Sequence, residues 1–347
     1  MSAPVRTFTA PYATRQVPRE GLVLLDRNEG LLPPATLLAA LDGAVDALRR
    51  YPDARPLEAA LAHRFGITSD RVLVTAGADD AIDRCCRAFL SGRALLTAEP
   101  TFEMLLRYAA TAGAPAVTVP WEEAFPTAGL VARLGAAGMV AVVSPNNPTG
   151  CTVTPDDLTA LARATGGRPI LLDHAYVEYA DDDLTLPALA LPNVIVVRTF
   201  SKAWGLAGCR VGYALGPVDL IRRLRIAGAP YAVAAPSLAL ALARLESGDD
   251  AVRTHVARVR LERDELSAAL RRAGVESTRS QANFVLGRFG GRARQVYEGL
   301  LARGILVRDF TNQLPGALRI SLPGDEAVFE RLMLALATVL TVSGGPS

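Results

Sequence analysis

The sequence predicts an open α/β fold with a mostly parallel sheet, followed by a smaller α+β unit. Between about residues 70 and 216, short apolar runs alternate with longer amphipathic stretches. Several runs are apolar on both faces, which is typical of parallel strands covered by helices on either side. After Ala235 this alternation gives way to a helical region rich in Ala, Leu and Arg, at about 237–273. The change of pattern predicts two units of different architecture.

The strands of the larger sheet are expected at the apolar runs 71–77, 94–98, 116–120, 139–145, 169–175, 194–201 and 211–216. Helical patterns lie between them, for example at 79–90 and 155–166. The second of these helices has clear end signals, because Thr154 is a predicted N-cap, Pro155 suits the first helical position and Gly166 lies near its end. In the smaller unit, strands are expected at 283–289, 304–309 and 317–323, before a final helix.

The chain length of 347 residues suggests two domains. We expect a large domain at residues 36–235. We expect residues 1–35 to form an N-terminal arm, and residues 236–347 to form a small domain with it.

The composition argues against several functional classes. The formal net charge is +2, and no basic stretch interleaves with aromatic residues, so nothing points to nucleic acid. The sequence has neither a run of about 18 apolar residues nor an apolar N-terminal segment, so we expect a cytoplasmic protein without a membrane anchor. The four cysteines and three histidines show no metal-type spacing, so we expect reduced thiols and no metal.

Lys202 is the only lysine in the chain, and the other 36 of its 37 basic residues are arginines. A codon bias toward arginine explains the scarcity of lysine but not its presence at this position. Arginine serves as well as lysine as a surface cation, but it cannot lose its proton to become an amine nucleophile. The single lysine therefore suggests amine chemistry, with Schiff-base formation as the leading candidate. A surface lysine retained by chance is the alternative.

Polar residues follow several predicted strands, at the carboxyl ends where open α/β sheets bind ligands. Asn147 follows the strand at 139–145, Asp173 and Tyr176 close the strand at 169–175, and Ser201 and Lys202 close the strand at 194–201. Each residue alone could belong to an ordinary turn or helix cap. Taken together, in this order, they form a much more specific pattern.

The pattern matches the needs of pyridoxal phosphate (PLP). This cofactor requires a lysine for a Schiff base, a carboxylate at its pyridinium nitrogen, and a hydroxyl or amide at its phenolate oxygen. It also requires an aromatic cover for the ring, and a helix N-terminus with a hydroxyl and a cation for its phosphate. In the same order, the chain offers Lys202; Asp173; Asn147 with Tyr176; Phe102; and Gly77-Ala78-Asp79 with Ser201 and Arg210.

Segments spread along nearly the whole chain carry a family resemblance: "APYA" (10–13), "RNEG" (27–30), "RYPDA" (50–54), "TAGADDAIDRCCRAFL" (75–90), "EPTFEM" (99–104), "SPNNPTG" (144–150), "DHAY" (173–176), "RTFSKAWGLAGCRVGYALG" (198–216), "ANFVLGRF" (282–289), "GILVRD" (304–309) and "LRIS" (318–321). Through them the chain resembles the fold-type I PLP-dependent aminotransferases of class I and II, most closely the histidinol-phosphate aminotransferase branch. The resemblance implies that an amino group moves between histidinol phosphate, or a related amino acid, and 2-oxoglutarate or glutamate.

The resemblance also implies roles for the cofactor site. Lys202 would form the Schiff base and carry the proton, Asp173 would face the pyridine nitrogen, and Tyr176 would complete the catalytic set. Asn147 and Tyr176 would bond the phenolate oxygen, and Phe102 would stack on the ring. The cofactor phosphate would be held by Ala78, Asp79, Ser201 and Arg210.

For the substrate, the resemblance implies that Arg319 clamps the α-carboxylate, with Asn283 beside it. Arg308 and Tyr12 match positions associated with the phosphate end of histidinol phosphate. Tyr51 would reach the cofactor phosphate of a neighbouring subunit, which implies a homodimer.

Some positions depart from the family pattern, mostly around the substrate. Arg27 adds a charge near the mouth of the expected site, and the 27–30 segment ends in Gly30. His174 stands where an acid is expected, either as a group that titrates near neutral pH or as a ring held by a hydrogen bond.

Three alternative functions stay open at this point. One is a PLP-dependent decarboxylase of the threonine-phosphate type, or an enzyme of specialised metabolism that oxidises or cyclises an amino acid. A second is a ligand sensor without enzymatic activity, although such proteins carry a basic helix-turn-helix domain ahead of this fold. The third, a nicotinamide-dependent dehydrogenase, fits poorly because no GxGxxG follows a first strand.

Overall fold

The computed structural model describes residues 8, 19–42, 44–135 and 137–342. Its larger sheet has seven strands in the order β2-β8-β7-β6-β5-β3-β4. All neighbouring strands are parallel except β8, which is antiparallel to both β2 and β7. The strands are β2 (Val72–Thr75), β3 (Ala94–Glu99), β4 (Ala116–Pro120), β5 (Ala137–Val143), β6 (Ile170–Asp173), β7 (Val194–Thr199) and β8 (Gly212–Leu215). The mostly parallel sheet is thus confirmed, with one antiparallel strand inside it.

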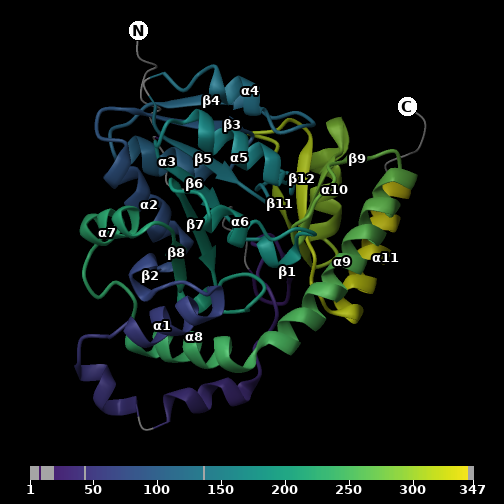
Figure 1. The fold of residues 1–347 in the computed structure, drawn as a ribbon. Helices are drawn as coiled ribbons and strands as arrows, with labels where there is room; N and C mark the ends of the chain where they lie inside the picture. Colours follow the sequence, from purple (N-terminus) through teal and green to yellow (C-terminus); the bar gives the residue numbers. More distant parts are fainter. Residues whose placement is uncertain (1–7, 9–18, 43, 136, 343–347) are drawn as a thin grey trace.

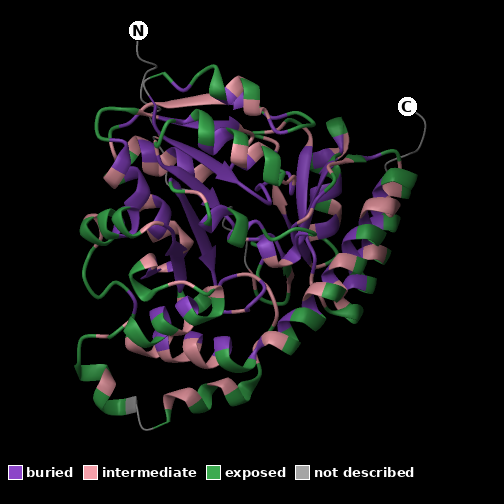
Figure 2. Ribbon diagram, viewed as in Figure 1, coloured by how far each residue is buried: buried purple, intermediate pink, exposed green. Residues whose placement is uncertain are grey.

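Helices cover both faces of this sheet (Figure 1). On one face lie α2 (Gly77–Phe89), α3 (Glu103–Thr111) and α7 (Val218–Ala227), and on the other lie α1 (Arg55–Phe65), α4 (Thr127–Val131), α5 (Pro155–Ala164), α6 (Thr185–Leu189) and α8 (Ala235–Ser247). In β5, Met139 and Ala141 pack into the first layer, whereas Val140 and Val142 pack into the second. Burial on both faces explains why the central strands are apolar throughout, and they are buried along their length in Figure 2.

The predicted start of α5 is confirmed. The Thr154 hydroxyl accepts a hydrogen bond of 3.1 Å from the Asp157 backbone N–H, and the Asp157 carboxylate accepts one of 3.2 Å from the Thr154 N–H. This reciprocal capping box satisfies two backbone donors that the first helical turn leaves open.

A second sheet has the strand order β1-β11-β12-β10-β9. Its strands are β1 (Val23–Leu25), β9 (Glu276–Ser277), β10 (Phe284–Arg288), β11 (Ile305–Asp309) and β12 (Ala317–Ser321). The sheet packs against α9 (Asp249–Arg272) and α10 (Ala293–Leu301), and α11 (Glu326–Val342) packs against α10. The helical region expected at 237–273 is divided at Gly248 into α8 and α9. A Cβ at Gly248 would lie 2.5 Å from the Arg244 carbonyl oxygen, so the chain passes there only without a side chain.

β1 pairs in parallel with β11, which brings the N-terminal segment to the edge of the second sheet. The chain then runs through the 3-10 helices η1 (Ala35–Leu41) and η2 (Ala44–Arg49) beneath α8 (Figure 1). Shorter 3-10 turns are η3 (Ser69–Arg71), η4 (Val177–Tyr179), η5 (Ala207–Cys209) and η6 (Gly290–Arg292). The boundaries expected at residues 35 and 235 stay predictions. Within the described residues, no helix combines the length and the apolar character needed to cross a membrane.

Candidate active site

One cavity lies where the carboxyl ends of β5, β6 and β7 meet the segment after β1 and the strands β11 and β12. Most residues that the sequence singled out for the site line it: Ala78, Asp79, Phe102, Asn147, Asp173, Tyr176, Ser201, Lys202, Arg210, Arg308 and Arg319. Parallel strands end at the same edge of a sheet, which explains why residues distant in sequence gather there.

Lys202 lies two residues beyond the Phe200 that follows β7, and its side chain reaches into the cavity. Its Nζ donates a hydrogen bond of 3.0 Å to the Arg27 carbonyl oxygen and lies 5.5 Å from the centroid of the Tyr176 ring. Burial, and then the positive charge of Arg319, lower the pKa of Lys202 to about 8. A usable fraction of the amine is therefore unprotonated near neutral pH, as a nucleophile or proton acceptor requires.

Asp173 is the last residue of β6 and is buried, with one carboxylate oxygen accepting a 3.0 Å hydrogen bond from the Ala175 N–H. Burial raises the pKa of Asp173 to about 7, and the hydrogen bond from Ala175 offsets only part of this rise. A buried carboxylate of this kind is stabilised by a cation at the cavity. The protonated ring nitrogen of PLP is such a cation.

We expect Asp173→Asn to change how the stability of the cofactor-free protein depends on pH. In the unfolded chain Asp173 loses its proton near its ordinary pKa of 3.8, whereas in the folded protein it keeps the proton to about pH 7. The folded state thus binds more protons in this window, and the wild type loses stability as pH rises from about 4 to about 7. The variant should lack this loss, which amounts to a few kcal/mol at most.

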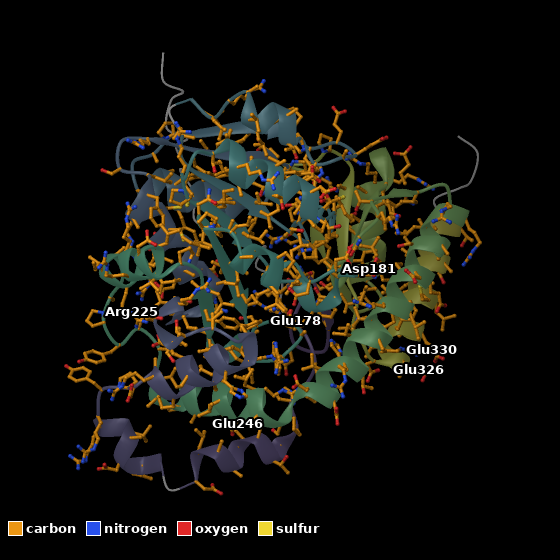
Figure 3. All side chains as sticks on the ribbon, viewed as in Figure 1. Glu178, Asp181, Arg225, Glu246, Glu326 and Glu330 are labelled. Atoms are coloured by element: carbon orange, nitrogen blue, oxygen red, sulfur yellow. The ribbon has the colours of Figure 1, made fainter. Side chains whose placement is uncertain are left out.

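Urea unfolding of the cofactor-free wild type and variant across this pH range measures the difference. Asp181→Asn is the matched control, because Asp181 is an exposed aspartate (Figure 3). If the free energies of unfolding of the wild type and of Asp173→Asn change by the same amount between pH 4 and pH 7, the raised pKa of Asp173 is wrong.

The N-terminus of α2 forms one wall of the cavity together with Ser201 and Arg210. Arg210 adopts a left-handed backbone conformation with φ of 51°, and its guanidinium donates to the Ser201 hydroxyl at 3.2 Å and to the Asp79 carboxylate at 3.1 Å. Gly77 has φ of 79°, and a Cβ there would lie 2.7 Å from an Arg210 nitrogen. Glycine thus lets the guanidinium approach the helix N-terminus. A helix N-terminus, a hydroxyl and a guanidinium are the donors that suit a phosphate.

Two arginines face the cavity from adjacent strands of the second sheet. Arg308 of β11 is paired in register with Arg319 of β12, so both side chains lie on the same face. The buried Arg319 guanidinium donates to the Asn147 side-chain oxygen at 2.6 Å and to the Asp26 carbonyl oxygen at 2.9 Å. These contacts orient the fork of Arg319, as bidentate binding of a carboxylate requires.

Two predicted site residues that the structure describes, Asn283 and Tyr51, do not line this cavity. Asn283 is buried beside it, where its amide donates a 3.2 Å hydrogen bond to the Asn28 carbonyl oxygen. Tyr51 is 80% exposed and stacks on Tyr231 with ring centroids 4.5 Å apart, and neither residue lines this cavity. Tyr12 lies outside the described residues.

His174 is buried behind the cavity, and its Nδ1 contacts the Ser144 carbonyl oxygen. Burial lowers the pKa of His174 to about 4, so the ring is neutral near pH 7. Of the two interpretations left open by the sequence, the structure favours a ring held by a hydrogen bond.

The segment after β1 contributes Arg27, which the sequence placed near the mouth of the site, and also Asp26 and Asn28, to which the sequence assigned no role. Asp26, Arg27 and Asn28 all line the cavity, and Asn28 is 1% exposed. The motif at 27–30 was the signal in the sequence that could have pointed to this segment. It does not indicate that Asp26 and Asn28 contact Arg319 and Ser321, which are 293 residues away in each case. The groups around the cavity fit PLP: an amine whose pKa is lowered, a buried carboxylate, and hydrogen-bond donors at the N-terminus of α2 that suit a phosphate.

The sequence model of the family described as aminotransferase class I and II matches residues 20–336. A histidinol-phosphate aminotransferase from Cronobacter sakazakii is 35% identical, covering 96% of this chain and 94% of that protein. Another from Roseiflexus castenholzii is 38% identical, covering 88% of this chain and 86% of that protein. The solved structure of a histidinol-phosphate aminotransferase from Sinorhizobium meliloti, in complex with pyridoxal-5'-phosphate, superimposes with a TM-score of 0.85. It is 26% identical and covers 93% of this chain and 92% of that chain.

Proposed function

Because this chain belongs to the class I and II aminotransferases and is a PLP-dependent enzyme, we propose that it transfers the amino group of histidinol phosphate, or of a related amino acid, to 2-oxoglutarate. The observation that carries the substrate class is the pair Arg308 and Arg319, side by side on β11 and β12 and facing the cavity that holds Lys202. Two guanidinium groups suit substrates that present a phosphate or a carboxylate.

Each side chain has a proposed task toward the cofactor. When bound, PLP supplies a carbonyl carbon for amine exchange and a ring that withdraws electrons from the substrate Cα. Asp173 faces the ring nitrogen and keeps it protonated, while Phe102 covers the ring. Asn147 and Tyr176 bind the phenolate oxygen, and Ala78, Asp79, Ser201 and Arg210 hold the phosphate at the N-terminus of α2.

Lys202 carries the proton in this mechanism. With PLP bound, the Lys202 amine would accept the proton that leaves the substrate Cα and return it in the reverse half-reaction. In the cofactor-free protein its pKa is already lowered to about 8. Arg319 holds the α-carboxylate of glutamate, and Arg308 binds the phosphate of histidinol phosphate, which has no α-carboxylate. Tyr12 completes the phosphate site, and Asn283 supports the carboxylate site beside Arg319.

We also propose a homodimer in which Tyr51 reaches the cofactor phosphate of the partner subunit. Tyr51 and Tyr231 present an exposed stacked pair, and Tyr231 has a left-handed backbone with φ of 55°. Leu38 and Leu48 nearby in the chain are also exposed, at 62% and 66%. Exposed large apolar side chains of this number favour a protein interface. The four free cysteines fit a reducing compartment, so we propose the cytoplasm as the site of action.

The substrate assignment is tested by the specificity of Arg308→Gln. In single-turnover spectroscopy, the wild-type holoenzyme should react with histidinol phosphate far better than with histidinol, which lacks the phosphate. The variant should lose about 10- to 100-fold in kcat/KM for histidinol phosphate, because one charge-assisted hydrogen bond contributes about 1.5–3 kcal/mol. Its reaction with histidinol should change little.

The same experiment separates the alternative reactions. Transamination converts the cofactor to its amine form, and 2-oxoglutarate restores it. Release of CO2 would instead indicate a decarboxylase, and consumption of oxygen would indicate an oxidase. If Arg308→Gln lowered kcat/KM equally for histidinol phosphate and for histidinol, Arg308 would not be the phosphate-binding residue.

A further inference from the structure

Asn28 connects the two sheets at the edge of the cavity. It follows β1 with a left-handed backbone, φ 58°, a conformation that asparagine tolerates better than most residues. Its side-chain Nδ2 donates a 3.0 Å hydrogen bond to the Tyr176 hydroxyl oxygen, from the larger sheet's side. Its Oδ1 accepts a 2.6 Å hydrogen bond from the Ser321 hydroxyl at the end of β12. Both partners are buried.

Ser321 fixes which way the Asn28 amide points. The Ser321 oxygen accepts a 3.1 Å hydrogen bond from the Asn28 backbone N–H, so its own hydrogen is free to donate to Oδ1. The distance of 2.6 Å suits an O–H···O bond, and the 3.0 Å on the other side suits an N–H···O bond. A flipped amide would place an N–H group against Ser321 and remove the acceptor of the serine hydrogen.

The orientation of the amide determines what Tyr176 can do. A hydroxyl oxygen that accepts a hydrogen bond from Asn28 cannot donate its hydrogen to the same group, so the Tyr176 hydrogen is left for the cavity that both residues line. Phe284 packs edge-on against the Tyr176 ring, with centroids 5.2 Å apart, and holds it in place. Burial raises the pKa of Tyr176, so the hydroxyl keeps its proton.

We propose that Asn28 is a positioning residue that makes Tyr176 a hydrogen-bond donor toward the cofactor. This inference rests on the proposed function, in which the Tyr176 hydroxyl faces the phenolate oxygen of PLP. Donation to that oxygen stabilises its deprotonated form and lowers the pKa of the cofactor chromophore. Asn28 thereby acts on the cofactor through Tyr176, and Ser321 sets its orientation from the second sheet.

Asn28→Asp reverses the polarity of this contact with almost no change in shape. One carboxylate oxygen still accepts the Ser321 hydrogen, but the other faces Tyr176 as an acceptor, and the tyrosine hydrogen turns away from the cavity. We expect the pKa of the chromophore in the PLP-loaded enzyme, measured by pH titration of its visible absorption, to rise by about one unit. Tyr176→Phe, which removes the donor altogether, should raise it by a similar amount.

The charge of the new aspartate is separated from its effect on Tyr176 by a double-mutant cycle. In the Tyr176→Phe background, Asn28→Asp should produce no further shift. Asn28→Gly is the uncharged companion, because glycine accepts the φ of 58° and offers no side-chain donor or acceptor. It should shift the chromophore pKa less than Asn28→Asp. The charged groups that act on Tyr176 are Arg319, Asp173 and Asp79, and the Lys202 amine lies 5.5 Å from the centroid of its ring; all are retained in every variant.

Two results would overturn the inference and leave the proposed function standing. The first is that Asn28→Asp keeps the wild-type chromophore pKa while Tyr176→Phe raises it. The second is a shift from Asn28→Asp that persists in the Tyr176→Phe background, which would show a direct effect of charge. An unchanged chromophore pKa in Tyr176→Phe would overturn the proposed role of Tyr176 itself, and the inference with it.

Discussion

Lys202→Arg should abolish transamination, lowering kcat by about 10⁴-fold or more, because arginine keeps the charge but supplies neither a nucleophilic amine nor a proton acceptor. Borohydride reduction of the wild-type holoenzyme should leave PLP covalently attached to the Lys202 peptide, as seen by mass spectrometry. The variant should carry no such adduct. In the wild type, capture of PLP by the cofactor-free protein should become faster as pH rises through about 8, where Lys202 loses its proton.

The matched control is Arg271→Lys, which places a second lysine at an exposed position on α9, away from the cavity. This variant should keep wild-type activity, and its new lysine should remain unlabelled. Because Lys202 is the only lysine of the natural chain, no other side chain confuses the peptide assignment. Substantial activity in Lys202→Arg, or an adduct on another peptide, would show that the amine of Lys202 is not the reactive group.

Arg319→Lys should lower kcat/KM for glutamate by about 10²-fold, although the charge is conserved. The arginine fork is held by Asn147 and by the Asp26 carbonyl oxygen, at 2.6 and 2.9 Å. In its proposed role, it would present paired donors to the α-carboxylate of glutamate. Lysine offers a point charge in place of the fork, so at least one charge-assisted hydrogen bond of about 1.5–3 kcal/mol is lost. Half-reaction kinetics with glutamate measures the effect.

The loss should be smaller with histidinol phosphate, because that substrate has no α-carboxylate for Arg319 to hold. Arg288→Lys, at the exposed end of β10, is the control for a conservative change in the same sheet and should leave both half-reactions unchanged. Equal losses with glutamate and histidinol phosphate would assign Arg319 a general structural role in place of carboxylate binding.

Local sequence patterns were sufficient to predict the large sheet and most of the cavity lining. Each central strand is buried on both faces, so its apolar run is visible without knowledge of its neighbours, and β2 to β8 all lie within or close to the predicted runs. The polar residues at the ends of β5, β6 and β7 follow their strands directly. Because parallel strands end at one edge of a sheet, predicting the strands was enough to predict that Asn147, Asp173 and Lys202 come together.

By itself, the sequence thus determined the α/β fold and the set of groups that suits PLP, whereas the boundary near residue 235 stays a prediction. Only the tertiary structure decided how Asn28 and Asp26 enter the site, because β1 pairs with β11 and their partners, Ser321 and Arg319, are 293 residues away in the chain. It also decided that Asn283 is buried beside the cavity, where its amide donates to the Asn28 carbonyl oxygen, and does not line it. Strand periodicity and turn chemistry are local and can be read along the chain. The direction of a buried hydrogen bond depends on partners that only long-range packing brings together.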